Sequence, residues 1–410
     1  MVLNFVWLGL FLVAGVFGAL RFFTGADPLV FPAMAQATFD SAKTAFEISI
    51  GLVGTLTLWL GLMKVGEDAG AIGLVARALS PLLSRVFPGL PAEHPASGSM
   101  VLNFAANLLG LDNAATPAGL KAMKELETLN PNPGTATNHQ IMFMALHAAS
   151  LTLFPVSIMA IRAAAGARNP ADIFLPILIA SLCSALGAFL SIALVQKIKL
   201  RDPVLLAWLG GALLLVCGLV AGVASLPHAQ VEAFSSVTGT FLLMAAILWF
   251  LTLAAIRKVN AWESFTTGAK EGFQTAVQII PFMVGILVAV GVFRASGAMA
   301  YLVQGLWALV SWTGLPQEGV GAIPTMILKP LSGGGARGLT IDCMKAYGVD
   351  SFAGRLSSVL QGSTDTTLYV LALYSGAVGL RNTRYALPCM LLADLCGFAG
   401  AIAMAILFFT

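Results

Sequence analysis

Asparagine, aspartate and hydroxyl side chains interrupt an otherwise apolar stretch at residues 93–123, EHPASGSMVLNFAANLLGLDNAATPAGLKAM. In a lipid bilayer such side chains persist only inside protein or beside water. Their amide, hydroxyl and carboxylate groups can hydrogen-bond a polar solute, so we expect a solute-binding cluster here. An ordinary soluble loop followed by a short helix is the alternative. The predicted members of the cluster are Ser97, Asn103, Asn107, Asp112, Asn113 and Thr116.

The dipeptide Thr116-Pro117 predicts the start of a helix beside this cluster. Threonine caps the free amides of a first turn, and proline fits the first helical position. A helix N-terminus carries partial positive charge, so it would face the polar cluster and favour an anionic group.

A second candidate site begins with the sequence SGGGARG at residues 332–338. Three consecutive glycines disfavour a helix interior, so we expect backbone amides turned inward as an anion cradle, with Arg337 adding a full charge. A close-packed helical turn with Arg337 reaching the membrane surface is the alternative. The solute-binding residues predicted in this half are Ser332, Gly333, Gly334, Arg337 and Gln361.

Asp365 lies in the middle of an apolar segment, within the sequence QGSTDTT. A charge at bilayer depth costs at least about 2.5–3.5 kcal/mol, so it needs a proton, a cation or an opposite charge. Thr364 and Thr366 flank it with hydroxyls that suit Na⁺ or a proton relay, and the three residues form the predicted ion-coupling site. A buried ion pair between Asp365 and Arg337 is the structural alternative. Asp394 is a second intramembrane acid, in surroundings that suggest no partner.

Membrane spans must position these residues. Of the 410 residues, 58% are hydrophobic and only 10% are charged, whereas soluble domains carry about 25% charged residues. The net charge of +3 is spread over the connections and gives no reason to expect a nucleic acid partner. Spans of about 20 apolar residues are predicted at residues 2–22, 46–64, 139–161, 173–195, 203–226, 233–256, 273–293, 352–380 and 384–409. Residues 25–46 are expected to be interfacial, and residues 73–85 and 298–312 to form surface helices.

Short sequence matches recur in the same order along the two halves of the chain. GLPAE at residues 89–93 corresponds to GLPQE at 314–318, and LHAAS at 146–150 to LQGST at 360–364. The fold class predicted is therefore an all-α polytopic membrane protein with two repeated halves, residues 1–198 and 199–410. Each half would contain a broken re-entrant hairpin, and five spans between the hairpins would invert one half relative to the other.

The distribution of lysine and arginine orients this arrangement. Lys197, Lys199 and Arg201 must share a side with Arg257, which we place in the cytoplasm because basic loops are retained there. Arg162 and Arg168 fall on the other side and count against this orientation.

PASGSMVLNFAANLLGLDNAATPAGLKAM in the first half resembles spore maturation protein A. KPLSGGGARGL and LQGSTDTTLYVLALYSGAVGLR in the second half resemble spore maturation protein B. Both are gate, or nucleoside-recognition, domain proteins, similar to the membrane parts of concentrative nucleoside transporters and of the ferrous-iron transporter. The resemblance implies a bacterial inner-membrane protein with a transporter-like core, and it identifies neither nucleosides as the solute nor sporulation as the process.

The resulting hypothesis is ion-coupled secondary transport of a small polar or anionic solute, nucleoside-like or a carboxylate metabolite, with Na⁺ or H⁺ as the coupling ion. The partners expected are this solute, the ion and the lipid bilayer; a homo-oligomer is allowed, and no cofactor or metal is expected. The alternative is a non-transporting membrane component that organises or regulates an envelope process such as spore maturation. We do not expect an enzyme, because no nucleophile motif or phosphate loop is present.

Overall fold

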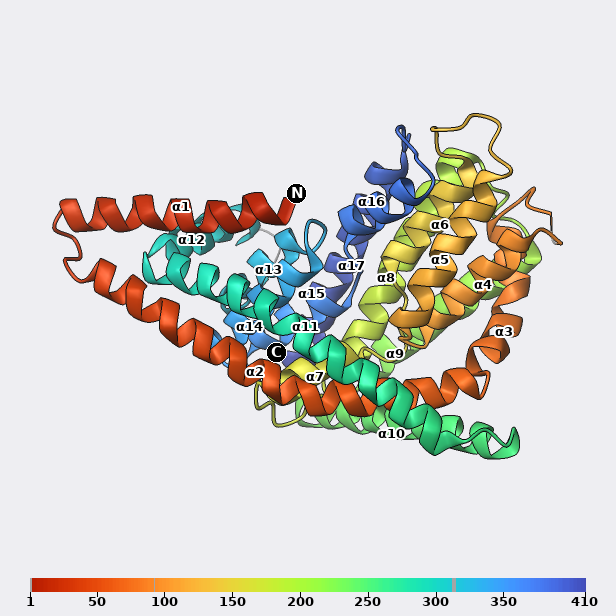
Figure 1. The fold of residues 1–410 in the computed structure, drawn as a ribbon, viewed down its shortest axis with the longest axis horizontal. Helices are drawn as coiled ribbons and strands as arrows, with labels where there is room; N and C mark the ends of the chain where they lie inside the picture. Colours follow the sequence, from red (N-terminus) through yellow and green to blue (C-terminus); the bar gives the residue numbers. More distant parts are fainter. Residues whose placement is uncertain (1, 92, 312–314) are drawn as a thin grey trace.

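The computed structural model describes residues 2–91, 93–311 and 315–410, and its regular elements there are helices (Figure 1). Seven of these helices are long and apolar enough to cross a membrane, which makes the chain a multi-pass membrane protein. They are α1 (Val2–Phe23), α2 (Val30–Asp68), α8 (Phe174–Gln196), α9 (Pro203–Ala224), α10 (His228–Ile256), α11 (Ala261–Ala295) and α17 (Ala386–Phe409).

Shorter helices fill the space between the long ones. In the first half they are α3 (Ala71–Val86), α4 (Pro95–Leu108), α5 (Asp112–Glu127), α6 (Asn138–Ala149) and α7 (Val156–Ala164). In the second half they are α12 (Ala298–Val310), the 3₁₀ turn η2 (Gln317–Ala322), α13 (Ile323–Leu328), α14 (Gly333–Tyr347), α15 (Phe352–Gly362) and α16 (Thr367–Ala377).

Two of the nine predicted spans are wrong, because each is divided into two short helices. The span at 139–161 consists of α6 and α7, separated by residues 150–155, which we call the first break. The span at 352–380 consists of α15 and α16, separated by residues 363–366, the second break. Pro155 opposes a helical conformation before it, and the Ser, Thr and Asp side chains of the second break compete for backbone hydrogen bonds.

The predicted interfacial segment at 25–46 is also corrected. From Val30 onward its residues continue without interruption into the next span as the 39-residue helix α2. The expected surface helices correspond to α3 and α12, which are 16 and 13 residues long and are not among the candidate spans. Trp312, predicted to end the second of them, lies outside the described residues.

Two pairs of equivalent helices pack antiparallel and join the halves. Along α2 and α11, Gly272 lies against the backbone of Leu56, and Gly291 lies against Ser41, so the two chains run in opposite directions (Figure 1). Along α8 and α17, Gly187 contacts Cys396 whereas Cys183 contacts Gly400, which is again an antiparallel order. Antiparallel pairing of equivalent helices is the arrangement that an inverted repeat requires.

The hydrophobic core does not divide at the predicted boundary between residues 198 and 199. One cluster combines Phe143 and Met144 of the first half with Val370 and Met390 of the second. A second cluster packs Ile161 and Ile177 against Ile341 and Phe398. Each of these two clusters therefore contains residues from both halves.

Candidate functional site

The first break is positioned by the turn between α4 and α5. The backbone N–H of Leu153 donates to the carbonyl oxygen of Leu108 at 2.8 Å. Gly110 in that turn has φ of +74°, and a Cβ atom there would come within 2.8 Å of the carbonyl oxygen of Phe154. Glycine is therefore required at this position both for the turn and for the close approach of the break.

The turn between α13 and α14 positions the second break in a similar way. The backbone N–H of Leu368 donates to the carbonyl oxygen of Pro330 at 2.9 Å. The second break also contacts the helix that precedes the first break, since the backbone N–H of Asp365 donates to the carbonyl oxygen of Ala148, in the last turn of α6, at 2.8 Å. Each half thus contributes one discontinuous helix to a common junction.

A buried polar cluster lies at this junction and draws on both halves. The Asn103 amide donates to the carbonyl oxygen of Ala115 at 2.6 Å, which leaves its Oδ1 atom 3.0 Å from His147 Nδ1. In one tautomer His147 Nδ1 donates to Asn103 Oδ1, and in the other it accepts from the Asn107 amide nitrogen, which lies 2.9 Å away. The Tyr374 hydroxyl lies 3.2 Å from His147 Nε2. Two amides, an imidazole and a phenol form one hydrogen-bonded network.

An acidic cluster lies beside the second break. Asp394 of α17 is almost fully buried, and its carboxylate accepts the Thr367 hydroxyl at 2.6 Å. Lys329 and Asp365 are both within electrostatic range of Asp394. Asp365 is partly buried, and its carboxylate accepts the backbone N–H of Thr366 at 2.6 Å. Two carboxylates and several hydroxyls are therefore grouped at the level of the break.

Comparisons with known proteins agree with this two-part organisation. The family model for Gate, described as nucleoside recognition, matches residues 49–165 and 276–381, which together make up more than half of the chain. The chain belongs to the Gate family. The two Gate segments contain α4 to α7 and α14 to α16, and therefore both breaks.

Two curated relatives from Bacillus subtilis (strain 168) match with most of their own length. Spore maturation protein B is 47% identical over 168 residues, which cover 41% of this chain and 91% of the relative. Spore maturation protein A is 38% identical over 187 residues, which cover 46% of this chain and 92% of the relative. No solved structure matches the chain.

The first Gate segment brings together only some of the predicted residues. Asn103 and Asn107 lie in the polar cluster, whereas Ser97 lies in the first turn of α4 and bonds the carbonyl oxygen of Pro91 at 3.2 Å. Thr116 is partly buried on α5. The side chains of Asp112 and Asn113 are outside the part of the chain that the structure describes.

The predicted helix start at Thr116-Pro117 is wrong. Helix α5 begins at Asp112, and Pro117 lies inside it. Pro117 is the sixth residue of α5, so its ring removes one intrahelical N–H bond without ending the helix.

The glycine run of the second Gate segment is helical, in contrast to the expected irregular cradle. Ser332 caps α14 by accepting the Gly335 N–H at 3.1 Å, and Gly333 to Gly335 form the first turn. A side chain at Gly333 would overlap Thr366 of the second break, and one at Gly334 would overlap Phe282 of α11. These glycines therefore allow close packing, which was the alternative interpretation.

The other predicted residues of this half surround the second break. The Gln361 amide donates to the Gly333 carbonyl oxygen at 3.4 Å, and Thr364 and Thr366 are buried. Arg337 is partly buried on α14. Solute binding by Arg337 and its ion pair with Asp365 stay predictions.

Three residues of the junction were missed as binding candidates, namely His147, Tyr374 and Asp394. The correspondence of His147 with Gln361 in the repeated motif was a usable signal, because both residues precede a break by two or three positions. Tyr374 and Asp394 lie in apolar helices, and only the tertiary fold brings them to the junction.

A buried ion-pair cluster connects the halves on one side of the junction. Arg162 is fully buried, and its guanidinium lies 3.0 Å from Asp172 Oδ1 and 3.1 Å from Asp350 Oδ1. It also donates to the Val349 carbonyl oxygen at 2.9 Å. Arg355 pairs with the other oxygen of Asp172 at 2.8 Å. We call Arg162, Asp172, Asp350 and Arg355 the ion-pair cluster.

Loops connect the halves on the other side. The Asn382 backbone donates to the Gly134 carbonyl oxygen at 3.0 Å and accepts the Ala136 N–H at 2.9 Å. The Arg384 guanidinium donates to Asn138 Oδ1 at 3.0 Å. We call these five residues the loop contact.

The ion-pair cluster and the loop contact lie at opposite ends of α8 and α17. Helix α8 begins just after Asp172, and at its other end the Gln196 amide donates to the Asn138 carbonyl oxygen at 2.9 Å. Helix α17 begins just after Arg384, and its final ring, Phe409, lies 5.1 Å from the Arg355 guanidinium. With 23 residues, α8 is about 35 Å long, enough to cross a bilayer.

This geometry predicts the accessibility of two engineered cysteines. Thr128 ends α5 on the side of the loop contact, and Ala346 is exposed near the end of α14, on the side of the ion-pair cluster. In a variant without the five native cysteines, Thr128→Cys and Ala346→Cys should react with an impermeant maleimide from opposite faces of the membrane. Labelling of both from the same face would contradict the inverted arrangement.

Proposed function

We propose that the protein is an ion-coupled secondary transporter of a small polar solute in the bacterial inner membrane. The observation that carries the proposal is the contact of two discontinuous helices, one from each half, through the Asp365 N–H and the Ala148 carbonyl oxygen. Secondary transporters with inverted repeats place their sites between the repeats, at helices interrupted near the midplane. Broken backbone at this depth otherwise has no evident use.

The side chains at the junction favour a solute that forms several hydrogen bonds. Asn103, Asn107, His147 and Tyr374 supply both donors and acceptors without a net charge. This set suits a nucleoside-like solute, while Arg337 is the candidate partner for the charged group of a carboxylate metabolite. Movement of one half against the other would expose the junction to one face at a time.

The acidic cluster is the proposed ion-coupling site. Asp365 and Asp394 are carboxylates within an apolar region, and the hydroxyls of Thr364, Thr366 and Thr367 lie on the same short segment. Carboxylate and hydroxyl oxygens suit either Na⁺ or a transferred proton, so the driving force would be a Na⁺ or H⁺ gradient.

A non-transporting role in an envelope process is the second candidate. It is favoured by the names of the two relatives, spore maturation proteins A and B, which refer to a process and to no solute. In that case the junction would hold the two halves together, and no solute would cross.

Reconstituted liposomes separate these candidates. Purified protein would be tested for uptake of labelled uridine, adenosine and succinate under an inward Na⁺ gradient, an inward H⁺ gradient or neither. Gradient-dependent uptake above that of protein-free liposomes supports transport. Absence of uptake across a broad panel of nucleosides and carboxylates would favour the envelope role.

Replacement of Asn107 by Leu should preserve the fold but reduce uptake by at least about tenfold. The amide at this position bonds His147, and loss of a hydrogen bond to a polar solute together with an unsatisfied site group costs about 1–3 kcal/mol. Uptake would be compared at matched protein density, with Ser97→Ala as the control, because Ser97 lies outside the polar cluster. Full uptake by Asn107→Leu would assign the cluster to structure alone.

A further inference from the structure

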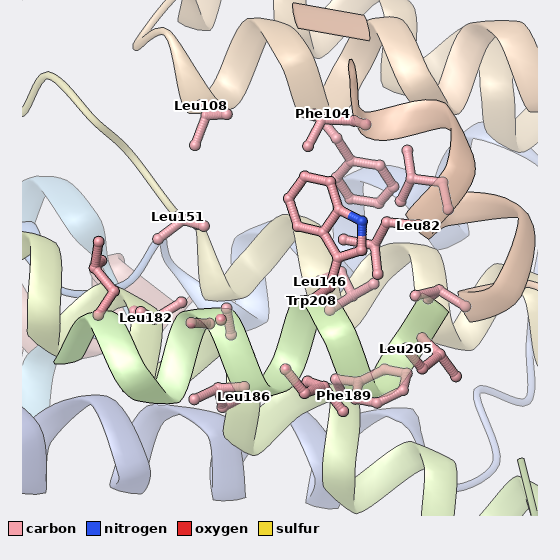
Figure 2. A pocket seen from close by; sticks show the side chains of 18 of the residues that line it. Leu82, Phe104, Leu108, Leu146, Leu151, Leu182, Leu186, Phe189, Leu205 and Trp208 are labelled. Carbon is pink, nitrogen blue, oxygen red and sulfur yellow. The ribbon is translucent and has the colours of Figure 1, made fainter. Parts of the chain in front are cut away.

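An apolar cavity of about 720 Å³ lies among α3, α4, α8 and α9 (Figure 2). Its described lining consists of leucine, valine, phenylalanine, alanine and glycine residues, with Trp208 and Asn107 as the exceptions. The cavity extends to Leu151 and Leu153 of the first break. A space of this size and composition suits an apolar ligand and holds little for water to bond.

Helix α9, which forms one wall of the cavity, is poorly packed against the rest of the protein. Only 6% of the most apolar 18-residue stretch of α9 is buried inside the protein, compared with 56% of the corresponding stretch of α8. An unfilled cavity would deprive its lining atoms of dispersion contacts. In a bilayer, lipid is the apolar molecule available to fill this cavity.

Basic residues surround one end of the cavity. Arg85 lies on α3 between the lining residues Leu83 and Val86; its side chain is half exposed and pairs with the Asp202 carboxylate at 3.7 Å. Lys199 and Arg201 precede α9 and are exposed. This end of α8 and α9 is also the side of the loop contact, which the placement of basic residues assigns to the cytoplasm. Basic residues at the cytoplasmic surface attract anionic lipid headgroups.

We propose that the cavity binds one acyl chain of an anionic phospholipid, whose headgroup lies beside Arg85, Lys199 and Arg201. The acyl chain passes along α9 and reaches the first break at Leu151, where it supports the non-helical segment. This site goes beyond the proposed transport function and does not depend on it.

Brominated lipids test the proposal because bromine quenches the fluorescence of nearby tryptophan. Full-length protein would be reconstituted in phosphatidylcholine vesicles that contain a small fraction of brominated phosphatidylglycerol or, in parallel, brominated phosphatidylcholine. The Trp208 signal is the difference between wild type and Trp208→Phe. We expect the anionic lipid to quench it at a much lower fraction than the zwitterionic lipid. Trp249 on α10, isolated in the same way, should respond equally to both.

Two variants define the chain and headgroup positions. Gly211 lines the cavity, and a Cβ atom there meets nothing within 4 Å, so Gly211→Phe should occupy the space and abolish the preferential quenching. Gly218→Phe on the same helix is the control, since Gly218 has similar free space outside the cavity. Replacement of Arg85 by Ser should weaken the preference for the anionic lipid roughly fivefold.

Equal quenching of Trp208 by the two brominated lipids would overturn the proposal, as would undiminished preference in Gly211→Phe. A preference that survives the replacement of Arg85, Lys199 and Arg201 together would refute the headgroup position.

Discussion

Replacement of Arg162 by Ala is expected to lower the free energy of unfolding by about 3–5 kcal/mol, the usual cost of breaking a buried ion pair. The change leaves Asp172 fully buried and Asp350 partly buried, without the guanidinium that lies about 3 Å from each carboxylate. It also removes the hydrogen bond between the halves at Val349. The measurement is thermal stability of the purified protein in detergent.

Arg168→Ala is the matched control for this prediction. Arg168 lies in the loop just after α7, the helix that carries Arg162; its side chain is exposed, and its backbone N–H donates to Asp350. Its replacement should leave stability unchanged within about 0.5 kcal/mol. Similar stability of the Arg162→Ala protein and the control would show that the ion-pair cluster contributes little.

The deficit of the Arg162→Ala protein should also depend on pH. Burial raises the pKa of the Asp172 carboxyl, and Arg162 and Arg355 oppose this effect. Without Arg162, the Asp172 carboxyl binds a proton more readily in the folded protein than in the unfolded chain, where aspartates titrate near pH 3.9. Stability of the variant should therefore fall as pH rises above that value, and the difference from wild type should shrink toward acidic pH.

Replacement of Asp394 by Asn is expected to abolish the dependence of uptake on an ion gradient without destabilising the protein. The amide oxygen introduced by this change could still accept the Thr367 hydroxyl, so this hydrogen bond is kept. Loss of the buried charge removes both its desolvation cost and its attraction to Lys329; because these two effects oppose each other, thermal stability should stay close to that of wild type. The measurements are gradient-driven uptake in liposomes and thermal stability.

The control for this substitution is Asp40→Asn, because Asp40 is exposed on α2 and its carboxylate accepts the Gln36 amide of the same helix. The dependence of uptake on an ion gradient should be unchanged in the Asp40→Asn protein. A marked loss of stability in the Asp394→Asn protein would instead identify Asp394 as a structural residue. Unchanged gradient dependence would leave Asp365 as the sole coupling candidate.

Most of the membrane-spanning architecture could be predicted from the sequence, because a span needs only length and low polarity. Those criteria identify α8 and α9 to within two residues at each end, and they place the end of α10 correctly but its start five residues too late. They fail where a span is interrupted, because the first break is itself apolar in LTLFP and resembles a continuous helix. Only Pro155 signals it, and proline alone also occurs inside helices, as Pro281 does in α11.

The candidate site was partly predictable for a different physical reason. Asn103, Asn107 and Asp365 are polar residues in apolar surroundings, a local property that the sequence displays directly. The partnership of His147 with Tyr374 spans 227 positions along the chain, and no local pattern contains that information. Likewise, glycines at Gly333 and Gly334 look similar whether they form a loop or a tightly packed helical turn.

The loop contact and the ion-pair cluster differ in how water affects the cost of separating them. The loop contact joins the halves at one end of α8 and α17, and the ion-pair cluster joins them at the other. At the loop contact, water can replace each backbone hydrogen bond as it separates, and the cost is small. At the ion-pair cluster, separation rehydrates charges that were desolvated on folding, and solvation offsets much of the lost attraction. Neither contact therefore prevents the two halves from separating. Under the proposed transport function, single substitutions in either contact would shift the balance between inward-open and outward-open forms.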